Sequence, residues 1–210
     1  QGKRVFIEFE GVFRDSVFWI NGTYMDRHNS GYTSFLFEIT DHLVFGEDNS
    51  IAVRVDTSQA EGWWYEGSGV YRNVFLYVAE PVYIKPRKTI IKTALDGRVS
   101  VECTVVNDTP EPFCGDVVFE TADIASVHTA IAPYGEAVVK VELHIESPRL
   151  WHVDAPNLYT LSIRIGEEIH TESFGVRTVG FDPDRGFLLN SKPLKIHGAC
   201  VHQDFGGVGV

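Results

Sequence analysis

Two polar side chains near the C-terminus have the types and the spacing best suited to chemistry. His202 and Asp204 follow an apolar run from Leu194 to Cys200. Residues two apart on an extended chain point the same way, so the two side chains can converge on one ligand. An imidazole and a carboxylate both form directional hydrogen bonds, which suits the hydroxyl groups of a sugar. A polar loop with solvated side chains has the same pattern, and the spacing alone leaves both readings open.

A second candidate is the aromatic cluster Trp63-Trp64-Tyr65, which lies beside Gly67 and Gly69. Aromatic faces stack on the C–H surfaces of sugars, so the cluster is a possible binding platform. Packing at a domain interface is the other interpretation, and we favour it for Trp64 and Tyr65. Glu61 and Glu66 flank the cluster in the sequence.

The sequence shows no sign of a metal or a nucleotide cofactor. Cys103, Cys114 and Cys200 have no Cys-x-x-Cys spacing, and we expect reduced, buried thiols, although Cys103 and Cys114 could face each other across a hairpin. No metal-ligand spacing on a shared face relates six of the histidines, namely His28, His42, His128, His144, His152 and His170. Glycine-rich phosphate-binding motifs and the nucleophile elbow of serine hydrolases are missing from the sequence, so we expect no cofactor.

Composition limits the partners. The chain has 210 residues and a net charge of −11. An acidic surface repels phosphate backbones and anionic lipid, so we expect neither nucleic acid nor a membrane as partner. No apolar run reaches the length of a transmembrane helix. The chain starts at Gln1 without a signal peptide, which we interpret as a cut within a longer protein, and the compartment stays open.

The elements that position these residues are strands, because hydrophobicity alternates with period two and helical periodicity is scarce. Up to residue 80 we expect strands at Arg4–Glu10, Ser16–Ile20, Thr23–Met25, Ser34–Ile39, Ile51–Asp56 and Val74–Val78. Beyond it we expect strands at Val82–Ile84, Thr89–Ala94, Arg98–Asn107, Asp116–Glu120, Ala137–Ile145, Tyr159–Ile165 and Glu168–Phe174. About seven short strands in about a hundred residues are typical of an immunoglobulin-like sandwich. We expect two further strands at Phe187–Leu189 and Leu194–Cys200, the second of them buried.

Three stretches together resemble glycoside hydrolase family 2, which includes β-galactosidases, β-glucuronidases and β-mannosidases. The first runs from Phe9-Glu10-Gly11 through Trp19, Asn21-Gly22 and Gly31-Tyr32 to Trp64-Tyr65 and Gly69-Val70-Tyr71-Arg72-Asn73. The second comprises Ser147-Pro148, Leu150-Trp151, Pro156-Asn157-Leu158-Tyr159 and Phe174-Gly175-Val176-Arg177. The third comprises Gly186-Phe187, Leu189-Asn190, Lys192-Pro193, Gly198, Cys200, His202 and Asp204. They occur in the family's order along almost the whole chain, and their combination is specific.

The resemblance implies an all-β fold followed by the start of a barrel. Residues 1–80 correspond to the C-terminal part of a sugar-binding jelly roll and residues 81–179 to an immunoglobulin-like sandwich. Residues 180–210 correspond to the first segment of a truncated TIM barrel. At the end of its first strand, His202 and Asp204 match residues that contact the non-reducing sugar, on the face where such barrels bind substrate.

The resemblance also implies a function. The chain corresponds to a fragment of a retaining β-glycosidase, β-galactosidase-like, with a carbohydrate as partner and a possible homo-oligomeric state. Both catalytic Glu residues of the family lie farther along its barrel, and the adjacent pair Glu167-Glu168 falls in an expected hairpin turn where its side chains diverge. We therefore expect no catalytic residue here and no activity from this fragment alone. A carbohydrate-binding sandwich module without catalysis is the main alternative, and an adhesion or scaffold module is the weakest.

Overall fold

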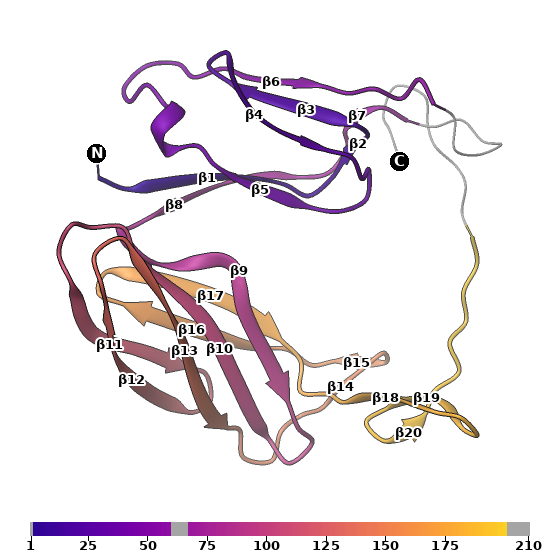
Figure 1. Cartoon of the computed structure of the whole chain (residues 1–210). Coiled ribbons are helices and arrows are strands. Elements are labelled where there is room, and N and C mark those ends of the chain that lie inside the picture. Colours follow the sequence, from indigo (N-terminus) through magenta and orange to yellow (C-terminus); the bar gives the residue numbers. More distant parts are fainter. Residues whose placement is uncertain (1, 60–66, 201–210) are drawn as a thin grey trace. The chain divides into compact units, whose positions relative to one another are not determined.

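A computed structural model describes residues 2–59 and 67–200, and within these ranges the chain is built almost entirely from strands (Figure 1). The one helical element of the described ranges is a 3-10 turn, η1 (Thr40–His42). No helix in these ranges is long and apolar enough to cross a membrane. The all-β expectation is confirmed. The chain divides into a first compact unit, formed mainly by Gln1–Ala79, and a second, formed by Glu80–Gly198.

The first unit consists of short antiparallel strands around an aromatic core. Its strands are β1 (Arg4–Phe9), β2 (Val12–Phe13), β3 (Ser16–Ile20), β4 (Thr23–His28), β5 (Phe35–Glu38), β6 (Ile51–Arg54), β7 (Gly69–Val70) and β8 (Val74–Ala79). They form sheets in the orders β5-β1-β8, β4-β3-β6 and β2-β7. The ring centroid of Phe18 on β3 lies 5.0 Å from that of Phe9 on β1 and 4.9 Å from that of Phe35 on β5. These rings join the two larger sheets into one core.

The hairpin between β3 and β4 turns at Asn21-Gly22, as the sequence predicts. Both residues have positive φ, 47° for Asn21 and 81° for Gly22, which is the backbone that this dipeptide tolerates. Alternation along β3 would equally allow Trp19 to be a core residue, but the structure places the other face of the strand inside. Phe18 and Ile20 are buried, whereas Trp19 is half-buried on the other face and packs edge-on against Tyr24. Period-two alternation identifies two faces, and packing against β1 and β5 decides which one is inside.

The second unit is a larger set of antiparallel strands. Its strands are β9 (Val82–Thr93), β10 (Arg98–Asn107), β11 (Phe113–Glu120), β12 (Ile124–Ile131), β13 (Gly135–His144), β14 (Trp151–His152), β15 (Ala155–Pro156), β16 (Tyr159–Ile165), β17 (Glu168–Phe174), β18 (Val179–Asp182), β19 (Gly186–Leu189) and β20 (Lys192–Pro193). The strand orders are β13-β10-β9, β12-β11-β16-β17, β14-β15 and β18-β19-β20. The first two sheets are the main ones.

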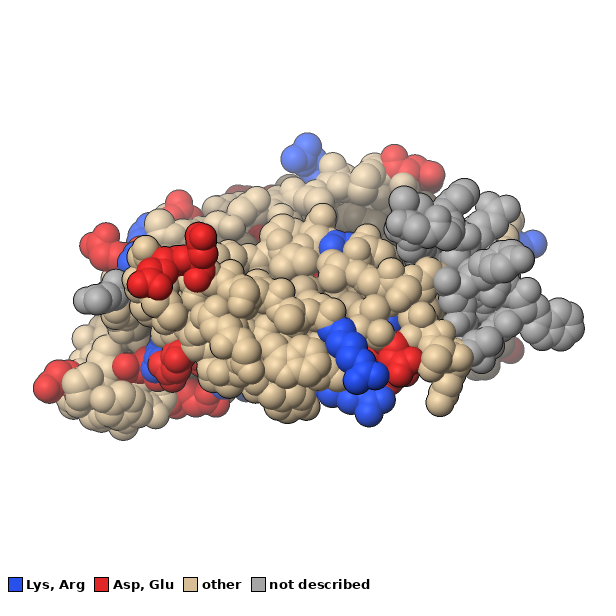
Figure 2. Space-filling view, turned by 90° about the horizontal axis from the view of Figure 1, so that it is seen from above, with Lys and Arg blue, Asp and Glu red and all other residues tan. Residues whose placement is uncertain are grey.

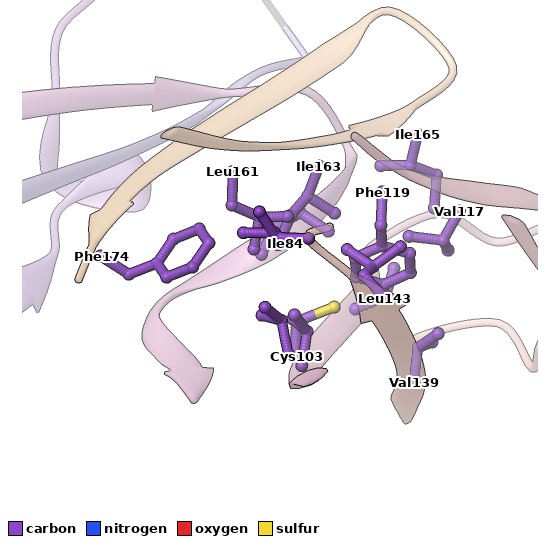
Figure 3. Close-up of a cluster of buried hydrophobic side chains, with 14 of the residues drawn as sticks. Ile84, Cys103, Val117, Phe119, Val139, Leu143, Leu161, Ile163, Ile165 and Phe174 are labelled. Carbon is purple, nitrogen blue, oxygen red and sulfur yellow. The ribbon is translucent and has the colours of Figure 1, made fainter. Parts of the chain in front are cut away.

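The two main sheets of the second unit share one hydrophobic core. Figure 3 shows side chains of both sheets meeting there, among them Cys103 on β10, Phe119 on β11 and Leu161 and Ile163 on β16. Along β10 every second residue from Val99 to Asn107 is buried, the alternation that the sequence predicts. Burial of this kind, at roughly 25 cal/mol per Å² of apolar surface, is the main stabilising term of a sandwich.

Strands β9 and β12 of the second unit differ from the sequence-based expectation. The strands expected at Val82–Ile84 and Thr89–Ala94 are one strand, β9, whose register against β10 shifts between Cys103 and Val105. Strand β12 was not predicted, because small and polar residues fill half of its positions and blur the alternation. Its pairing with β11, from Phe113↔Ile131 to Glu120↔Ile124, is what holds it in the sheet.

Charged side chains are spread unevenly over the surface. On the face that Figure 2 shows, a broad uncharged expanse occupies the middle and charged groups lie around it. The positive side chains described on this face form no extended basic patch. This distribution accords with a chain in which 29 acidic residues outnumber 18 basic ones.

Candidate functional site

The residues that sequence analysis ranked first lie outside the described part of the chain. His202 and Asp204 fall in residues 201–210, and Trp63-Trp64-Tyr65 with Glu61 and Glu66 fall in residues 60–66. Their assignment therefore stays a prediction.

The segment that leads to His202 does not form the buried strand that we expected. Leu194–Cys200 has no regular secondary structure, and all of it except Leu194 is exposed. A strand needs a neighbour with which to share backbone hydrogen bonds. Within the described ranges no strand pairs with this segment, and β20 (Lys192–Pro193) is the last element before it. Apolar composition alone is therefore not enough to make a strand of these residues.

A pocket in the second unit gathers motif residues of the second stretch. Its volume is about 640 Å³, and it opens between the ends of β9 and β17. The lining comprises Thr89, Ile91, Lys92, Thr93, Trp151, Leu158, Glu172, Ser173, Phe174, Gly175, Arg177, Thr178 and Val179. Residues far apart in sequence thus meet at one end of the sandwich.

Trp151 and Arg177 form the centre of this pocket wall. The guanidinium carbon of Arg177 lies 4.3 Å from the centroid of the Trp151 ring, a cation–π contact. Gly175 also packs against Trp151. A side chain at this position would clash, because its Cβ would lie only 2.8 Å from the Trp151 Cβ. No sequence signal predicts this pairing, since the two residues belong to separate motifs and only the fold brings them together.

Hydrogen bonds to the backbone groups of Trp151 and Arg177 hold the pair in place. The Trp151 amide donates to the Val176 carbonyl at 2.9 Å, and the Asn190 side-chain amide donates to the Trp151 carbonyl at 3.0 Å. The Thr93 hydroxyl donates to the Arg177 carbonyl at 2.9 Å and accepts from the Arg177 amide at 3.1 Å. Strand β9, the Trp151 hairpin and the segment after β17 are therefore locked to one another.

This arrangement suits a structural role, in which the pair joins segments of the sandwich, better than it suits sugar binding. Stacking on a sugar needs a free aromatic face, and one face of Trp151 already carries Arg177. Glu172 accepts a hydrogen bond from the His170 ring at 2.9 Å, which gives that carboxylate a partner on its own strand. In the first unit the guanidinium carbon of Arg72 lies 5.4 Å from the Tyr71 ring centroid, a cation–π contact.

Three described carboxyl groups have a shifted pKa, and in each the shift is downward, unlike that of a general acid. Hydrogen bonds from Ser58 lower the pKa of Asp56, those from Arg98 lower the pKa of Asp96, and those from Arg185 lower the pKa of Asp182. A general acid at neutral pH needs a raised carboxyl pKa, as burial in an apolar site produces. These three groups are stabilised as carboxylates, the opposite direction.

The cysteines correct one expectation. All three thiols are free, as predicted, but only Cys103 is buried, whereas Cys114 and Cys200 are exposed. Desolvation raises the pKa of Cys103 to about 12, with a smaller contribution from the Glu102 carboxylate. Among residues 2–59 and 67–200, no group of three or more His, Cys, Asp or Glu side chains could hold a metal ion.

Comparison with known proteins relates this geometry to a family. Residues 82–177 match the model of the glycosyl hydrolases family 2. The chain is 36% identical to the β-galactosidase BoGH2A of Bacteroides ovatus over 99% of its own length and 26% of that protein. It is 34% identical to a putative β-glucuronidase of Formosa agariphila over 99% of the chain and 21% of that protein.

A solved structure agrees with the sequence matches. A glycosyl hydrolase family 2 member from Bacteroides cellulosilyticus superposes with a TM-score of 0.85 and 30% identity, over 97% of this chain and 30% of that one. The chain therefore spans about a quarter of the length of the relatives that it matches. Residues 82–177 thus match the model of the glycosyl hydrolases family 2, and the chain as a whole resembles a part of proteins of that family in sequence and in fold.

Proposed function

We propose that the chain is the non-catalytic β-sandwich part of a retaining β-glycosidase of the β-galactosidase type. The observation that carries this proposal is the asymmetry of the match with BoGH2A, a β-galactosidase by name. It covers 99% of this chain but only 26% of that protein. A relative named as a β-glucuronidase is almost as similar, so the sugar is the part of the proposal that most needs the assay.

The proposed domain assignment follows the two units. We assign residues 1–80 to the C-terminal part of a jelly roll, which the small antiparallel sheets around an aromatic core support. We assign residues 81–179 to an immunoglobulin-like sandwich. Its support is a three-stranded and a four-stranded sheet on one core, together with the family match over residues 82–177. We assign residues 180–210 to the start of a TIM barrel.

Within this proposal the chain braces a catalytic barrel and does no chemistry itself. Retaining glycosidases cleave with two carboxyl groups about 5–5.5 Å apart, one of them protonated as a general acid. The three described carboxyls with shifted pKa values are all lowered, which does not suit the acid. The interlocked Thr93, Trp151, Arg177 and Asn190 supply a rigid end of the sandwich on which a neighbouring domain can rest.

His202 and Asp204 are the proposed sugar contacts. Both are good hydrogen-bonding partners for hydroxyl groups, and Leu194–Cys200 would form a paired strand once neighbouring barrel strands supply its hydrogen bonds. A bracing role for residues 1–200 and a binding role for these two side chains are separate parts of the proposal.

The test compares the product of the complete gene with the chain of residues 1–210. Both are assayed on the p-nitrophenyl β-glycosides of galactose, glucuronic acid and mannose. We expect the complete protein to hydrolyse the galactoside fastest with retention at the anomeric carbon, and the chain alone to stay at the background rate. Hydrolysis by the chain alone would contradict the non-catalytic assignment.

Point variants in the complete protein test the site. Removing a hydrogen bond that a charged group makes to substrate costs about 1.5–3 kcal/mol, so His202→Ala and Asp204→Ala should each lower kcat/KM about 10- to 100-fold. Gln203→Ala is the matched control, since residue 203 lies between the two in sequence and an extended chain would point its side chain the opposite way, so its kcat/KM should stay near the wild-type value. Normal turnover in both test variants would remove His202 and Asp204 from the site.

A further inference from the structure

A cluster of three chemically active side chains lies on the exposed face of the four-stranded sheet of the second unit, away from the pocket described above. Cys114 and Asp116 are both exposed on β11, and alternation places them on the same face. Asp116 pairs directly with His128 of β12, and Cys114 pairs with Ala130, two residues along. The strand register therefore brings a thiol, an imidazole and a carboxylate together although fourteen residues separate Cys114 from His128.

The distances show that the His128 ring contacts Asp116 through one nitrogen and Cys114 through the other. Asp116 Oδ1 lies 2.7 Å from His128 Nδ1, and His128 Nε2 lies 3.3 Å from Cys114 Sγ. A carboxylate is only an acceptor, so Nδ1 carries the hydrogen and donates it to Asp116. Nε2 is then the bare nitrogen, and it faces the thiol. This is the order of nucleophile, base and orienting group that activates a cysteine.

We infer that Cys114, His128 and Asp116 form a reactive-thiol site that is modified by low-molecular-weight disulfides. His128 Nε2 takes the thiol proton, and the Cys114 thiolate attacks one sulfur of the disulfide. The S–S bond of the reagent breaks as the bond from Cys114 Sγ to that sulfur forms. The other half leaves as a thiolate and receives the proton from His128, so Cys114 is oxidised and the released half is reduced. Asp116 stabilises the imidazolium that exists between the two proton transfers.

The site differs from the other two thiols of the chain. Cys103 is buried in the core, and burial raises its pKa to about 12, so it stays protonated and shielded. Cys200 is exposed, which makes it the internal reference for an accessible thiol. An ordinary thiol with a pKa of about 8.5–9 is only about 1–3% thiolate at pH 7, so complete activation can raise the reaction rate by about 30- to 100-fold at most.

The experiment measures modification at each cysteine of the chain of residues 1–210 at pH 7. The reagent is cystamine, a cationic disulfide that suits a chain with a net charge of −11. Peptide mapping by mass spectrometry gives the rate of mixed-disulfide formation at Cys114 and at Cys200. We expect Cys114 to react at least about fivefold faster than Cys200, and His128→Gln to remove that advantage.

Two further variants separate activation from mere exposure. Asp116→Asn should lower the Cys114 rate while leaving the Cys200 rate unchanged, because it alters only the orientation and charge of the base. His144→Gln, the same change at an exposed histidine of β13, is the matched control and should leave both rates unchanged. All the substituted side chains are exposed, so circular dichroism should show the same fold in every variant. Equal Cys114 rates in the wild-type chain and in His128→Gln would overturn the inference.

Discussion

Replacement of Asn107 by leucine should strongly destabilise the second unit. Asn107 ends β10 and is completely buried. Its side-chain amide donates to the carbonyls of Glu111, Ile131 and Ala132 at 2.8, 3.3 and 3.1 Å. Its carbonyl accepts from the Thr109 amide at 3.1 Å and from the Thr109 hydroxyl at 2.7 Å. One side chain thus ties β10, the 108–112 turn and the end of β12 together.

The size of the effect follows from the groups that lose their partners. Leucine fills a similar volume but removes all five hydrogen bonds, of which the one to the Ile131 carbonyl is buried and the other four are partly buried. Each buried group without a partner costs about 1–3 kcal/mol, so we expect the free energy of unfolding to fall by about 2–5 kcal/mol. Asn107→Asp tests the donors alone, because it keeps an acceptor for Thr109 and turns an oxygen toward three carbonyl oxygens. We expect it to be at least as destabilising at pH 7.

The assay is equilibrium urea unfolding followed by circular dichroism, with hydrogen exchange to assign the transition to residues 80–198. Asn157→Leu is the matched control, since Asn157 is half-buried and its side-chain amide donates to one carbonyl, that of Leu150. It should cost about 1 kcal/mol or less. If Asn107→Leu costs no more than Asn157→Leu, the hydrogen-bond reasoning is refuted.

Two other predictions concern the buried thiol and an exposed strand. The pKa of Cys103 is about 12 in the folded chain against 9.0 for a free thiol, so its contribution to stability is complete below pH 9 and is lost as the pH rises from 9 to about 12. We expect urea unfolding of the wild-type chain to lose about 1 kcal/mol more than Cys103→Val between pH 9 and 10, and an equal loss in both would contradict this. Strand β8 is an edge strand on which Leu76 is 61% and Val78 55% exposed, so the isolated chain should self-associate. Size-exclusion chromatography with light scattering should show this, and Leu76→Lys with Val78→Lys should shift the chain to monomer; a wild-type chain that is monomeric at every concentration would refute it.

Much of the strand pattern could be predicted because alternation is a local property. The bounds expected for Ser16–Ile20, Arg98–Asn107, Tyr159–Ile165 and Glu168–Phe174 are those of β3, β10, β16 and β17. The expected hairpin at Glu167-Glu168 is confirmed, with Ile165 paired to Glu168. Each of these outcomes depends on residues a few positions apart.

The failures have a common cause in non-local pairing. Strand β12 exists because β11 supplies its hydrogen bonds, and Leu194–Cys200 is not a strand because no described strand pairs with it. Trp19 and Phe18 alternate equally well, and packing against β1 and β5 selected Phe18 for the core. Local composition carries no information on which neighbour a segment will find.

By itself the sequence determined the all-β class, the positions of most strands and, through three ordered stretches, the resemblance to glycoside hydrolase family 2. The tertiary structure alone decided which side chains meet. Arg177 reaches Trp151, and His128 reaches Cys114 and Asp116, because antiparallel pairing aligns residues that lie far apart in the chain. Strand register is set by the summed packing and hydrogen bonding of whole sheets, so the spacing of any two residues in the sequence does not reveal it.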